Sequence, residues 1–461
     1  MSTRGEDVPH LVVAGAGGGL VAAVRAAQLG RKVLVVEASE HYLRASNTAM
    51  STAMVPGAGT RWQEQAGIDD SPEVFVADIA RKSHGQADAV LAAALARVSA
   101  RLVTWLADDV GLPISLVTDF PYPGHSRLRC HTVPGRTGKT LLAGLVGAAR
   151  ADPGITLISP ARLTGVGTDG GVVDHVVVTY PDGRTESIGT SAVLLATNGF
   201  GANPDLVRQY IPEIADALYH GSAESTGDAL RIGAALGAGT GFLDAYQGHA
   251  ALAMPARTLV GWATVMHGGF LVNAHAERFG DETVGYSEYA REILRQPGGR
   301  AVLVLDQRVH DACLAFDDFR DTVASGALRW AADVPGLADR LGLDPVRLGA
   351  TFASAGAAAR GEVADPLGRV EWGSPLTPPY AAVRVAPALF HTQGGLRVDG
   401  AARVLRPDGS AIPGLYASGG AAMSISGHGA GGYLAGNGLL PALGLALAAA
   451  DDVFARQPFA G

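Results

Sequence analysis

The stretch HLVVAGAGGGLVAAVRAAQLGRKVLVVE, residues 10–37, decides the fold of this chain. It predicts an apolar strand (10–13), a glycine loop (15–19), a helix of small residues (20–29) and a second strand (32–36) that ends in Glu37. This order is typical of a dinucleotide-binding unit, in which glycines let the backbone approach a pyrophosphate and the acid accepts the ribose hydroxyls. Glu37 follows Gly15 by 22 residues, close to the usual interval of about 20.

The glycines of this loop do not fill the usual G-x-G-x-x-G pattern. Counted from Gly15 and Gly17, the third glycine position holds Leu20; with Gly19 as the third glycine, the first two positions hold Ala14 and Ala16. Both alignments stay open at this point. A plain glycine-rich turn between a strand and a helix is the alternative to dinucleotide binding.

The composition indicates a compact globular enzyme. Glycine supplies 62 of the 461 residues, close to twice its usual share of about 7%. Hydrophobic residues make up 48% and charged residues 17%, and the net charge of −8 comes without long runs of like charge. We therefore expect no nucleic-acid partner and no anionic membrane surface as a partner. At this length two domains, or one elaborated domain, are expected.

The cysteines and the apolar segments favour a cytoplasmic protein without membrane insertion. Cys130 and Cys313 are too few for a disulfide framework or a cysteine metal site, and no His/Asp/Glu cluster has metal-ligand spacing, so we expect no metal. The polar start MSTRGEDVPH lacks the apolar core of a signal peptide and leaves no room for an N-terminal haem domain. The apolar run at 438–450 is short and contains a proline, which favours a buried helix.

Along the rest of the chain, strand patterns and helical patterns alternate. We expect residues 175–180 in the same layer as the first strands, pairing antiparallel with ITLIS (155–159) and LTGV (163–166), and a strand from 192 that ends in a glycine turn. The middle third shows helical periods at 312–324, 335–341 and 345–359. The sequence therefore predicts an α/β protein with a split Rossmann-like domain (1–244 and 377–461) and an inserted α+β cap (245–376).

These segments resemble the soluble fumarate reductase flavoproteins and the 3-ketosteroid dehydrogenases, which share one FAD-binding superfamily. The resemblance rests on the N-terminal unit and on further segments in the same order and spacing: SNTAMSTAMVPG (46–57), AGIDDSPEVFVADI (66–79), ATNGF (196–200), STGDALRIGAALGA (225–238), AERFGDE (276–282), FHTQGGLRVD (390–399) and GLYASGG (414–420). It implies FAD rather than NAD, and a cap that closes over the flavin. Relatives that bind flavin covalently have a histidine near Asn47, so noncovalent FAD is expected here.

By the same resemblance, loops from several parts of the chain hold the cofactor. The expected residues are Gly15, Ala16, Gly17, Gly18, Gly19, Glu37, Ala38, Ser46, Asn47, Thr48, Thr197, Asn198, Gly199, Asp228, Gly419, Gly420, Asn437, Leu439 and Leu440.

For the substrate, the two families imply different residues. A fumarate reductase needs two histidines and two arginines for its dicarboxylate; His249, His391 and Arg278 align with three of them, whereas HGAGGYLAGN (428–437) has no arginine for the fourth. Loss of a bidentate arginine weakens carboxylate binding, so fumarate is a poor substrate candidate.

The ketosteroid dehydrogenase pattern fits the same places better. It implies Tyr286, with Tyr289 as the less favoured choice, as the base that takes an α proton, and Tyr433 with the N–H of Gly436 as donors to the carbonyl oxygen. Tyr122 is a loose match to a third site tyrosine. Arg278 is expected to favour the phenolate of Tyr286 if the fold brings the two together.

Each of these residues also has a structural interpretation. Tyrosines in glycine-rich loops commonly pack with a hydrogen-bonded tip, and Arg278 has Glu277 and Asp281 nearby for a surface ion pair. His428 is a further candidate to face the flavin, while His125 and His131 are expected to be loop residues.

Together these patterns predict an FAD-dependent dehydrogenase that desaturates the C–C bond next to a ketone. A cyclic ketone that carries a carboxylate, such as an oxocyclohexanecarboxylate, is the favoured substrate, with a 3-ketosteroid-like ketone as the other form. The alternatives are a fumarate- or urocanate-type ene-reductase with Arg278 as proton donor, and a flavin-binding protein without turnover. The expected partners are a small-molecule substrate and an electron acceptor that the sequence does not specify.

Overall fold

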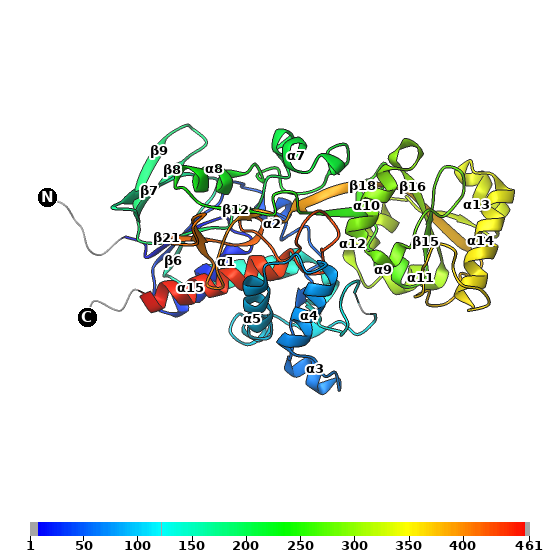
Figure 1. Ribbon diagram of the computed structural model, residues 1–461, viewed down its shortest axis with the longest axis horizontal. Helices are drawn as coiled ribbons and strands as arrows, with labels where there is room; N and C mark the ends of the chain where they lie inside the picture. The colour runs from blue at the N-terminus through cyan, green and yellow to red at the C-terminus, as the bar shows by residue number, and fades with distance from the viewer. Residues whose placement is uncertain (1–7, 121, 457–461) are drawn as a thin grey trace. The chain divides into compact units, whose positions relative to one another are not determined.

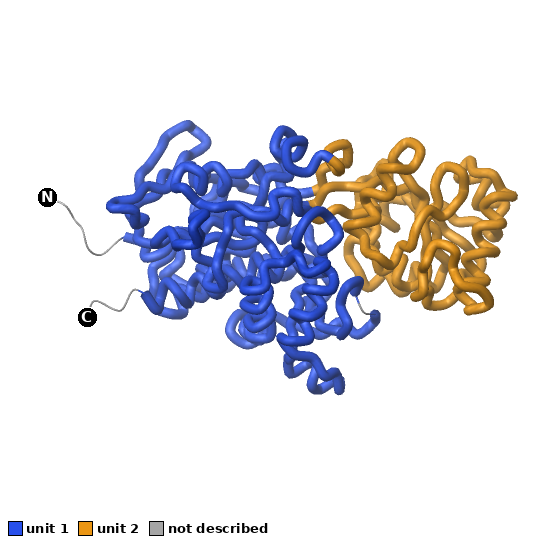
Figure 2. Tube along the Cα trace, viewed as in Figure 1, with its two compact units in different colours: residues 1–212, 221–246, 391–461 blue, residues 213–220, 247–390 orange. Residues whose placement is uncertain are grey.

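The computed structural model describes residues 8–120 and 122–456, and the chain divides into two compact units (Figure 2). Unit 1 comprises Met1–Pro212, Gly221–Tyr246 and His391–Gly461, and unit 2 comprises Glu213–His220 and Gln247–Phe390. The fold is mixed α/β, and unit 1 is built from three separated chain segments.

Unit 1 is organised around a six-stranded sheet with the order β20-β21-β10-β1-β2-β6 (Figure 1). Five neighbouring strands are parallel, and β20 joins the edge antiparallel to β21. The bounds are β1 Leu11–Ala14, β2 Val33–Val36, β6 Ile155–Ile158, β10 Val193–Leu195, β20 Arg403–Leu405 and β21 Ala411–Ala417. The runs LVVA, VLVV and VLL in β1, β2 and β10 are fully buried, as the strands of a parallel sheet covered on both faces require.

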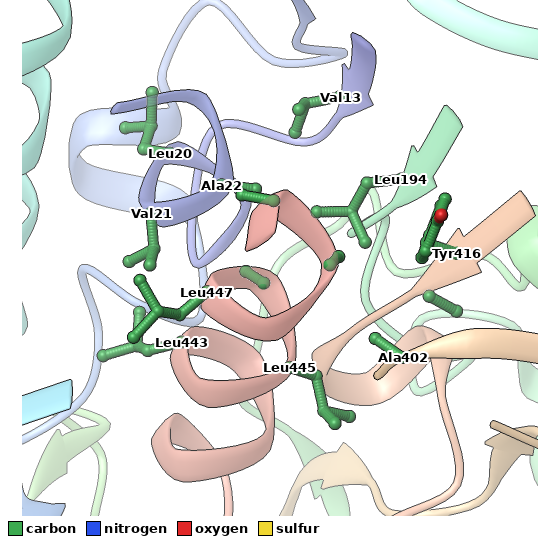
Figure 3. Packing of buried hydrophobic residues seen from close by; sticks show 14 of the residues in the cluster. Val13, Leu20, Val21, Ala22, Leu194, Ala402, Tyr416, Leu443, Leu445 and Leu447 are labelled. Carbon is green, nitrogen blue, oxygen red and sulfur yellow. The ribbon is translucent and has the colours of Figure 1, made fainter. Parts of the chain in front are cut away.

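The first and last long helices of unit 1 pack against each other. Helix α1 (Gly19–Gln28) lies beside the C-terminal helix α15 (Leu445–Arg456), which continues from a five-residue π-helix at Leu440–Gly444 (Figure 1). Figure 3 shows Val21 of α1 beside Leu443 and Leu447, within one core that also includes β1, β10 and β21. The apolar run at 438–450 therefore forms a buried helix, as predicted.

Unit 1 contains further helices and three small sheets. The helices are α2 Tyr42–Ala45, α3 Arg61–Gln65, α4 Pro72–Lys82, α5 Ala89–Asp108, α6 Gly138–Ala151, α7 Pro204–Tyr210 and α8 Asp228–Ala235. The small sheets are formed by β3 Val55–Pro56, β4 Ser115–Leu116 and β5 Cys130–Thr132; by β7 Arg162–Asp169, β8 Val172–Thr179 and β9 Thr185–Gly189; and by β12 Thr240–Gly241 and β19 Gly395–Leu396.

One strand prediction in this unit is wrong in part. Residues 175–180 are predicted in the same layer as the first strands, paired antiparallel with both ITLIS and LTGV. The pairing with LTGV is confirmed, since residues 175–179 lie in β8, which pairs antiparallel with β7; the shared layer and the pairing with ITLIS are wrong, because β7, β8 and β9 form a separate sheet. ITLI forms β6 and pairs parallel with β2 in the central sheet. Alternation of apolar residues indicates a strand but does not specify its partner, and β6 and β8 alternate alike.

Unit 2 contains a mostly antiparallel sheet with helices around it. The sheet follows the order β14-β13-β18-β16-β15, and β11 and β17 also pair with β18. The strands are β11 Leu218–Tyr219, β13 Tyr246–Ala253, β14 Thr258–Leu259, β15 Phe270–Val272, β16 Ala301–Asp306, β17 Arg329–Ala331 and β18 Tyr380–Thr392. The helices are α9 Ala263–Met266, α10 Tyr286–Leu294, α11 Gln307–Cys313, α12 Asp317–Ala324, α13 Val334–Leu341 and α14 Pro345–Ala359.

The helix predictions in unit 2 hold at 335–341 and 345–359 but not at 312–324. That segment is divided between α11 and α12, with Phe316 in extended backbone just before α12 and buried beneath it. Both predicted helices start from an aspartate cap, Asp333 and Asp344, each with a proline in the first turn.

Among the described residues, helix α5 is long and apolar enough to cross a membrane by length and composition, and half of its most apolar window is buried. A core helix of a soluble protein meets the same criterion, and Leu95 and Leu102 of α5 belong to the core of unit 1. Cys130 and Cys313 are free and buried, and burial raises the pKa of Cys130 to about 12. No group of three metal-ligating side chains occurs within 8–120 and 122–456.

Candidate active site

Four parallel strands of unit 1 end at residues that the sequence assigned to the cofactor. β1 ends before Gly15, β2 before Glu37, β10 shortly before Thr197, and β21 before Ser418 and Gly419. Because these strands are parallel neighbours, their carboxyl ends meet at one edge of the sheet, where α/β folds bind nucleotides.

The backbone of residues 15–19 decides how the glycine loop aligns with the G-x-G-x-x-G pattern. Gly15 has a φ of +109°, and a Cβ there would lie 2.3 Å from the carbonyl oxygen of Ala196, so Gly15 makes the tight turn. A Cβ on Gly19 would lie 2.7 Å from Val13 Cγ1, so Gly19 provides the close packing of helix on strand. The loop is therefore one residue shorter than the usual pattern, with Gly15 first and Gly19 last.

Glu37, which directly follows β2, forms a hydrogen bond with the backbone of the glycine loop. Its carboxylate accepts hydrogen bonds from the backbone N–H of Ala16 (2.7 Å) and of Ser39 (2.8 Å), and its side chain is buried. Burial raises the pKa of Glu37, while both N–H donors oppose that rise. The carboxylate thus lies beside the N-terminus of α1, where a ribose next to a pyrophosphate belongs.

Several buried polar atoms in the loops of unit 1 have no hydrogen-bond partner within the described residues. Thr197 Oγ1 and Ser418 Oγ lie just after β10 and β21, and Ser424 Oγ and Asn437 Oδ1 lie further along the chain. Unpartnered buried polar atoms are costly, so a cluster of them favours a ligand with its own donors and acceptors. Together with the glycine loop and Glu37, they fit a dinucleotide that carries a polar ring system.

The other expected cofactor residues are all in unit 1. Asn47 Oδ1 accepts from Ser222 N (2.6 Å), Asn198 Nδ2 donates to Ser225 Oγ (2.8 Å) with a φ of +63°, and Asp228 pairs with Arg162 (2.5 Å). The rest lie in the same loops: Gly17, Gly18, Ala38, Ser46, Thr48, Gly199, Gly420, Leu439 and Leu440. Asn47 is thus engaged with the backbone at the place where a histidine would be needed for covalent attachment.

A chain of side-chain hydrogen bonds leads to His391 at the end of β18. Asn437 Nδ2 donates to Ser426 Oγ (3.2 Å), and Ser426 Oγ donates to Gln393 Oε1 (2.9 Å). The amide of Gln393 then donates from Nε2 to Nδ1 of His391 (2.9 Å). Nδ1 also lies 3.3 Å from the carbonyl oxygen of Thr392, so the contact with Gln393 fits the tautomer protonated on Nε2 and the contact with Thr392 fits the one protonated on Nδ1. Burial lowers the pKa of His391 to about 4, so the ring stays neutral at pH 7.

The side chains of His391 and Tyr433 lie close to each other and to Gly438. Their ring centroids are 5.9 Å apart, and a Cβ on Gly438 would lie 2.9 Å from His391 Nε2 and 3.6 Å from Tyr433 Oη. Gly436, two residues earlier, has a φ of +88°, and its Cβ would collide with Pro56 at 2.4 Å. The loop 433–438 of unit 1 therefore presents neutral polar groups.

The candidate residues of unit 2 form an aromatic stack. His249 is buried in β13, and its ring stacks on Tyr286 and on Phe390, with 5.0 Å between centroids in each pair. Its Nδ1 accepts from the N–H of Ala251 (3.1 Å), which places the ring proton on Nε2. Burial, with a smaller effect of His220, lowers the pKa of His249 to about 3. Tyr286 is the first residue of α10.

Arg278 is held in a buried ion-pair network within unit 2. It donates to Glu282 (3.0 and 2.8 Å) and to Asp365 (2.8 and 3.2 Å), and its guanidinium lies 4.4 Å from the centroid of the Trp372 ring. The side chain is 5% exposed, and these acceptors raise its pKa further. Within residues 8–120 and 122–456, the hydrogen bonds and ion pairs of Arg278 go to Glu282, Asp365 and Gly280, whereas the sequence predicted a pairing with Tyr286.

Three less favoured site candidates, Tyr289, Tyr122 and His428, have the following surroundings. Tyr289 is 1% exposed, packs on Trp262 and Phe279, and has a buried hydroxyl without a partner among the described residues, so burial raises its pKa. Tyr122 contacts Phe120 in unit 1. His428 is exposed and pairs with Asp244 (2.9 Å). Tyr289 is thus a core residue.

Three groups of this site were missed by sequence reasoning: Gln393, Ser426 and Gly438. Gln393 follows His391 by two residues in FHTQGG, a spacing that places two side chains on one face of an extended chain, and this was the available signal. Ser426 and Gly438 act through tertiary contacts that no local pattern shows.

A family model described as FAD binding domain matches residues 10–439. The chain belongs to the FAD binding domain family. FAD is accordingly its cofactor. The chain is an FAD-dependent oxidoreductase.

Comparison with individual proteins gives the same family. The chain is 27% identical over 412 residues to an NADH:fumarate oxidoreductase of Klebsiella pneumoniae (strain 342), covering 89% of this chain but 44% of that protein. The chain thus spans less than half the length of this relative.

Two solved structures share the fold over 98% of this chain. An open conformation of a flavocytochrome c3 fumarate reductase superposes with a TM-score of 0.79 at 25% identity and is covered to 79%. The 3-ketosteroid-delta4-(5alpha)-dehydrogenase from Rhodococcus jostii RHA1, in complex with 4-androstene-3,17-dione, superposes with a TM-score of 0.75 at 24% identity and is covered to 98%. The shared feature is the fold.

Proposed function

We propose that this chain is an FAD-dependent dehydrogenase that desaturates the C–C bond next to the carbonyl group of a cyclic ketone. Bound FAD supplies the two-electron chemistry by accepting the β hydride. One observation carries the proposal: the polar groups at loop 433–438 of unit 1 are neutral. The His391 ring is neutral because burial lowers its pKa to about 4, Tyr433 presents a phenol, and Gly436 presents a backbone N–H.

Neutral donors suit a carbonyl oxygen better than a carboxylate. As an α proton leaves, the carbonyl oxygen gains enolate charge, and donors placed for that charge contribute roughly 3–4 kcal/mol each. A carboxylate is recognised by arginine forks instead, and Arg278 already satisfies two carboxylates. The charge balance therefore supports an uncharged, 3-ketosteroid-like ketone over the carboxylate-bearing ketone favoured from sequence.

Tyr286 is the proposed base for the α proton. Because Arg278 is engaged with Glu282 and Asp365, it does not favour the phenolate of Tyr286. A phenol without such help has a pKa near 10, so we expect the rate of proton removal to rise as the pH approaches that value.

The test is anaerobic mixing of the oxidised protein with a panel of saturated cyclic ketones, with flavin absorbance followed in a stopped-flow instrument. Bleaching by a ketone, at a rate that rises with pH, supports the proposal. Tyr286→Phe should abolish bleaching and leave FAD bound. Tyr289→Phe is the matched control, since it removes a buried hydroxyl three residues away and should leave the rate unchanged. Equal rates in wild type and Tyr286→Phe would remove Tyr286 from the mechanism.

The second candidate is the reverse reaction, reduction of an unsaturated acid of the fumarate or urocanate type. It is favoured by the 27% identity to a fumarate oxidoreductase. In this case the reduced protein is reoxidised by the unsaturated acid, and saturated ketones do not bleach the flavin. A protein that binds FAD but responds to neither class would be non-catalytic toward both.

A further inference from the structure

A buried histidine outside the set discussed so far contacts the loop that contains Gly436. His125 lies in the turn that follows Tyr122, with its side chain 7% exposed and its ring against Phe75. Its Nε2 is 2.9 Å from the carbonyl oxygen of Ala435, although 310 residues separate the two in sequence. The prediction that His125 is a loop residue is confirmed, although its side chain is buried and hydrogen-bonded; the same prediction for His131 is wrong, because His131 lies in β5.

The surroundings of His125 fix which ring nitrogen carries the proton. Arg129 Nη1 is 3.3 Å from His125 Nδ1, and a guanidinium only donates, so Nδ1 is an acceptor. Arg129 is itself held by Asp70 (2.8 and 3.0 Å) and by Asp78 (2.5 Å), all three being buried. Nε2 therefore carries the proton and donates to Ala435. Burial and the charge of Arg129 lower the pKa of His125 to about 4, which keeps the ring neutral.

The bond to Ala435 acts on one particular peptide group. The C=O of Ala435 and the N–H of Gly436 belong to the same trans amide, so they point in opposite directions. A donor on the oxygen draws charge from the amide and makes its N–H a stronger donor. Among the described residues no acceptor receives the Gly436 N–H, and Gly436 is only half-buried. The Gly436 N–H is thus available to a ligand, while the carbonyl oxygen of the same amide, that of Ala435, accepts from His125.

We propose that His125 is a positioning residue for the oxyanion donor: through Ala435 it orients and polarises the amide whose N–H belongs to Gly436. The ion-pair network of Arg129, Asp70 and Asp78 holds the histidine in its donating tautomer. This inference rests on the proposed function, in which the Gly436 N–H binds the carbonyl oxygen as it becomes enolate-like.

The test compares three substitutions of His125 with one control. His125→Leu keeps volume but loses the donor; His125→Asn has an amide that meets Arg129 but is too short for Ala435; His125→Gln places an N–H where Nε2 lies. His131→Leu is the control, because His131 is equally buried, contacts Arg129 O (2.9 Å) and Thr60 (2.9 Å), and makes no bond to residue 435.

With a ketone that bleaches the flavin, we expect kcat to fall about 10- to 100-fold in His125→Leu and His125→Asn, a part of the effect of one oxyanion donor. KM should change little, because the donor acts mainly on the charge of the transition state. His125→Gln should restore most of kcat, and His131→Leu should keep it. If His125→Leu does not fold, His125→Asn gives the same comparison.

A second readout does not need the substrate. 4-Fluorophenol, followed by 19F NMR, reports how far a bound phenol is ionised. We expect the wild type to bind it with a pKa below that of the free phenol, and both donor-deficient variants to raise that pKa while FAD stays bound. Unchanged kcat and phenol pKa in these variants would overturn the role of His125, as would equal losses in His131→Leu. A wild type that neither binds phenolate nor is bleached by ketones would refute the proposed function itself, and the inference with it.

Discussion

The side-chain amide of Gln393 donates a hydrogen bond of 2.9 Å to Nδ1 of His391. Because Ser426 donates to the amide oxygen, the amide turns its NH2 group toward Nδ1 and favours the tautomer of His391 that is protonated on Nε2, whereas the carbonyl oxygen of Thr392, 3.3 Å from Nδ1, favours the other. His391 stays neutral at pH 7 in either form, since burial lowers its pKa to about 4.

We expect Gln393→Glu to reverse this arrangement. A carboxylate only accepts, so Nδ1 would take up a proton and the pKa of His391 would rise toward or above 6.5. The pH profile of kcat/KM for ketone oxidation should then gain an ionisation between about 5 and 8 that the wild type lacks. Gln86→Glu is the control, because Gln86 accepts from the backbone N–H of His428 and is not one of the described residues that contact His391. Superimposable profiles in wild type and Gln393→Glu would contradict the contact between Gln393 and His391.

Gly436→Ala should impair both stability and turnover. A φ of +88° costs a residue with a Cβ roughly 1–2 kcal/mol, and the collision with Pro56 adds to that cost. Gly237→Ala is the matched control, since Gly237 has a φ of +73° and open space around it. Thermal unfolding should show a larger loss for Gly436→Ala, and only this variant should lower kcat, by about 100-fold. Equal losses in both variants would contradict the close contact with Pro56.

Arg278→Ala is expected to destabilise unit 2. It leaves Glu282 and Asp365, both fully buried, without their shared partner, which costs about 3–5 kcal/mol in comparable sites. Arg347→Ala breaks an exposed pair with Glu277 and should cost under about 1 kcal/mol. Urea unfolding measures both. If Arg278→Ala instead keeps its stability and loses only turnover, Arg278 acts on the substrate and the reductase alternative gains support.

Stability should fall in acid before the carboxylates titrate. The pKa values of His125, His131 and His391 are lowered to about 4 and that of His249 to about 3, from an ordinary value of 6.5. Between pH 6.5 and 4 these histidines are protonated in the unfolded chain but stay neutral in the folded chain. The free energy of unfolding therefore decreases by about 1.4 kcal/mol for each histidine and for each unit by which the pH falls. Urea unfolding at a series of pH values checks this, and His131→Leu should make the slope shallower. A constant unfolding free energy over this range would show that the rings are not held neutral.

The FAD should be released by acid precipitation, leaving a yellow supernatant, because Asn47 offers no nucleophile for covalent attachment. Glu37→Gln weakens a charge-assisted bond to the ribose and should reduce FAD affinity about 10- to 100-fold. Glu40→Gln, at an exposed position three residues on, is the control. Flavin fluorescence during dilution measures both affinities. Colour that stays with the precipitate would contradict noncovalent binding.

The sequence was most informative where structure is local. The β1-α1-β2 unit was predicted from residues 10–37 because its turn, helix and strands follow one another, and the glycine loop needs special backbone. Residues 175–180 were assigned to the wrong sheet, since β6 and β8 are both short apolar strands and pairing is decided by the rest of the fold.

The site was less predictable for the same reason. Arg278 was expected either in the site or on the surface, yet its partner Asp365 lies 87 residues away and holds it in a buried network. The bonds from Asn437 through Ser426 to Gln393, and from His125 to Ala435, join residues 11 to 310 positions apart. Charge and tautomer depend on such contacts, so the preference for an uncharged ketone required the structure.

The pairing of Val193 in β10 with Leu415 in β21 has a consequence for biosynthesis. The ribosome completes β1, β2 and β10 long before β21 and α15 emerge, so the nascent sheet has an open edge at β10 while unit 2 is being made. Ser418 and Asn437 are synthesised after unit 2, and we therefore expect FAD to bind late in maturation. A truncation that removes β21 and everything after it should leave the edge of β10 unpaired and open to chaperones, and the truncated chain should not bind FAD.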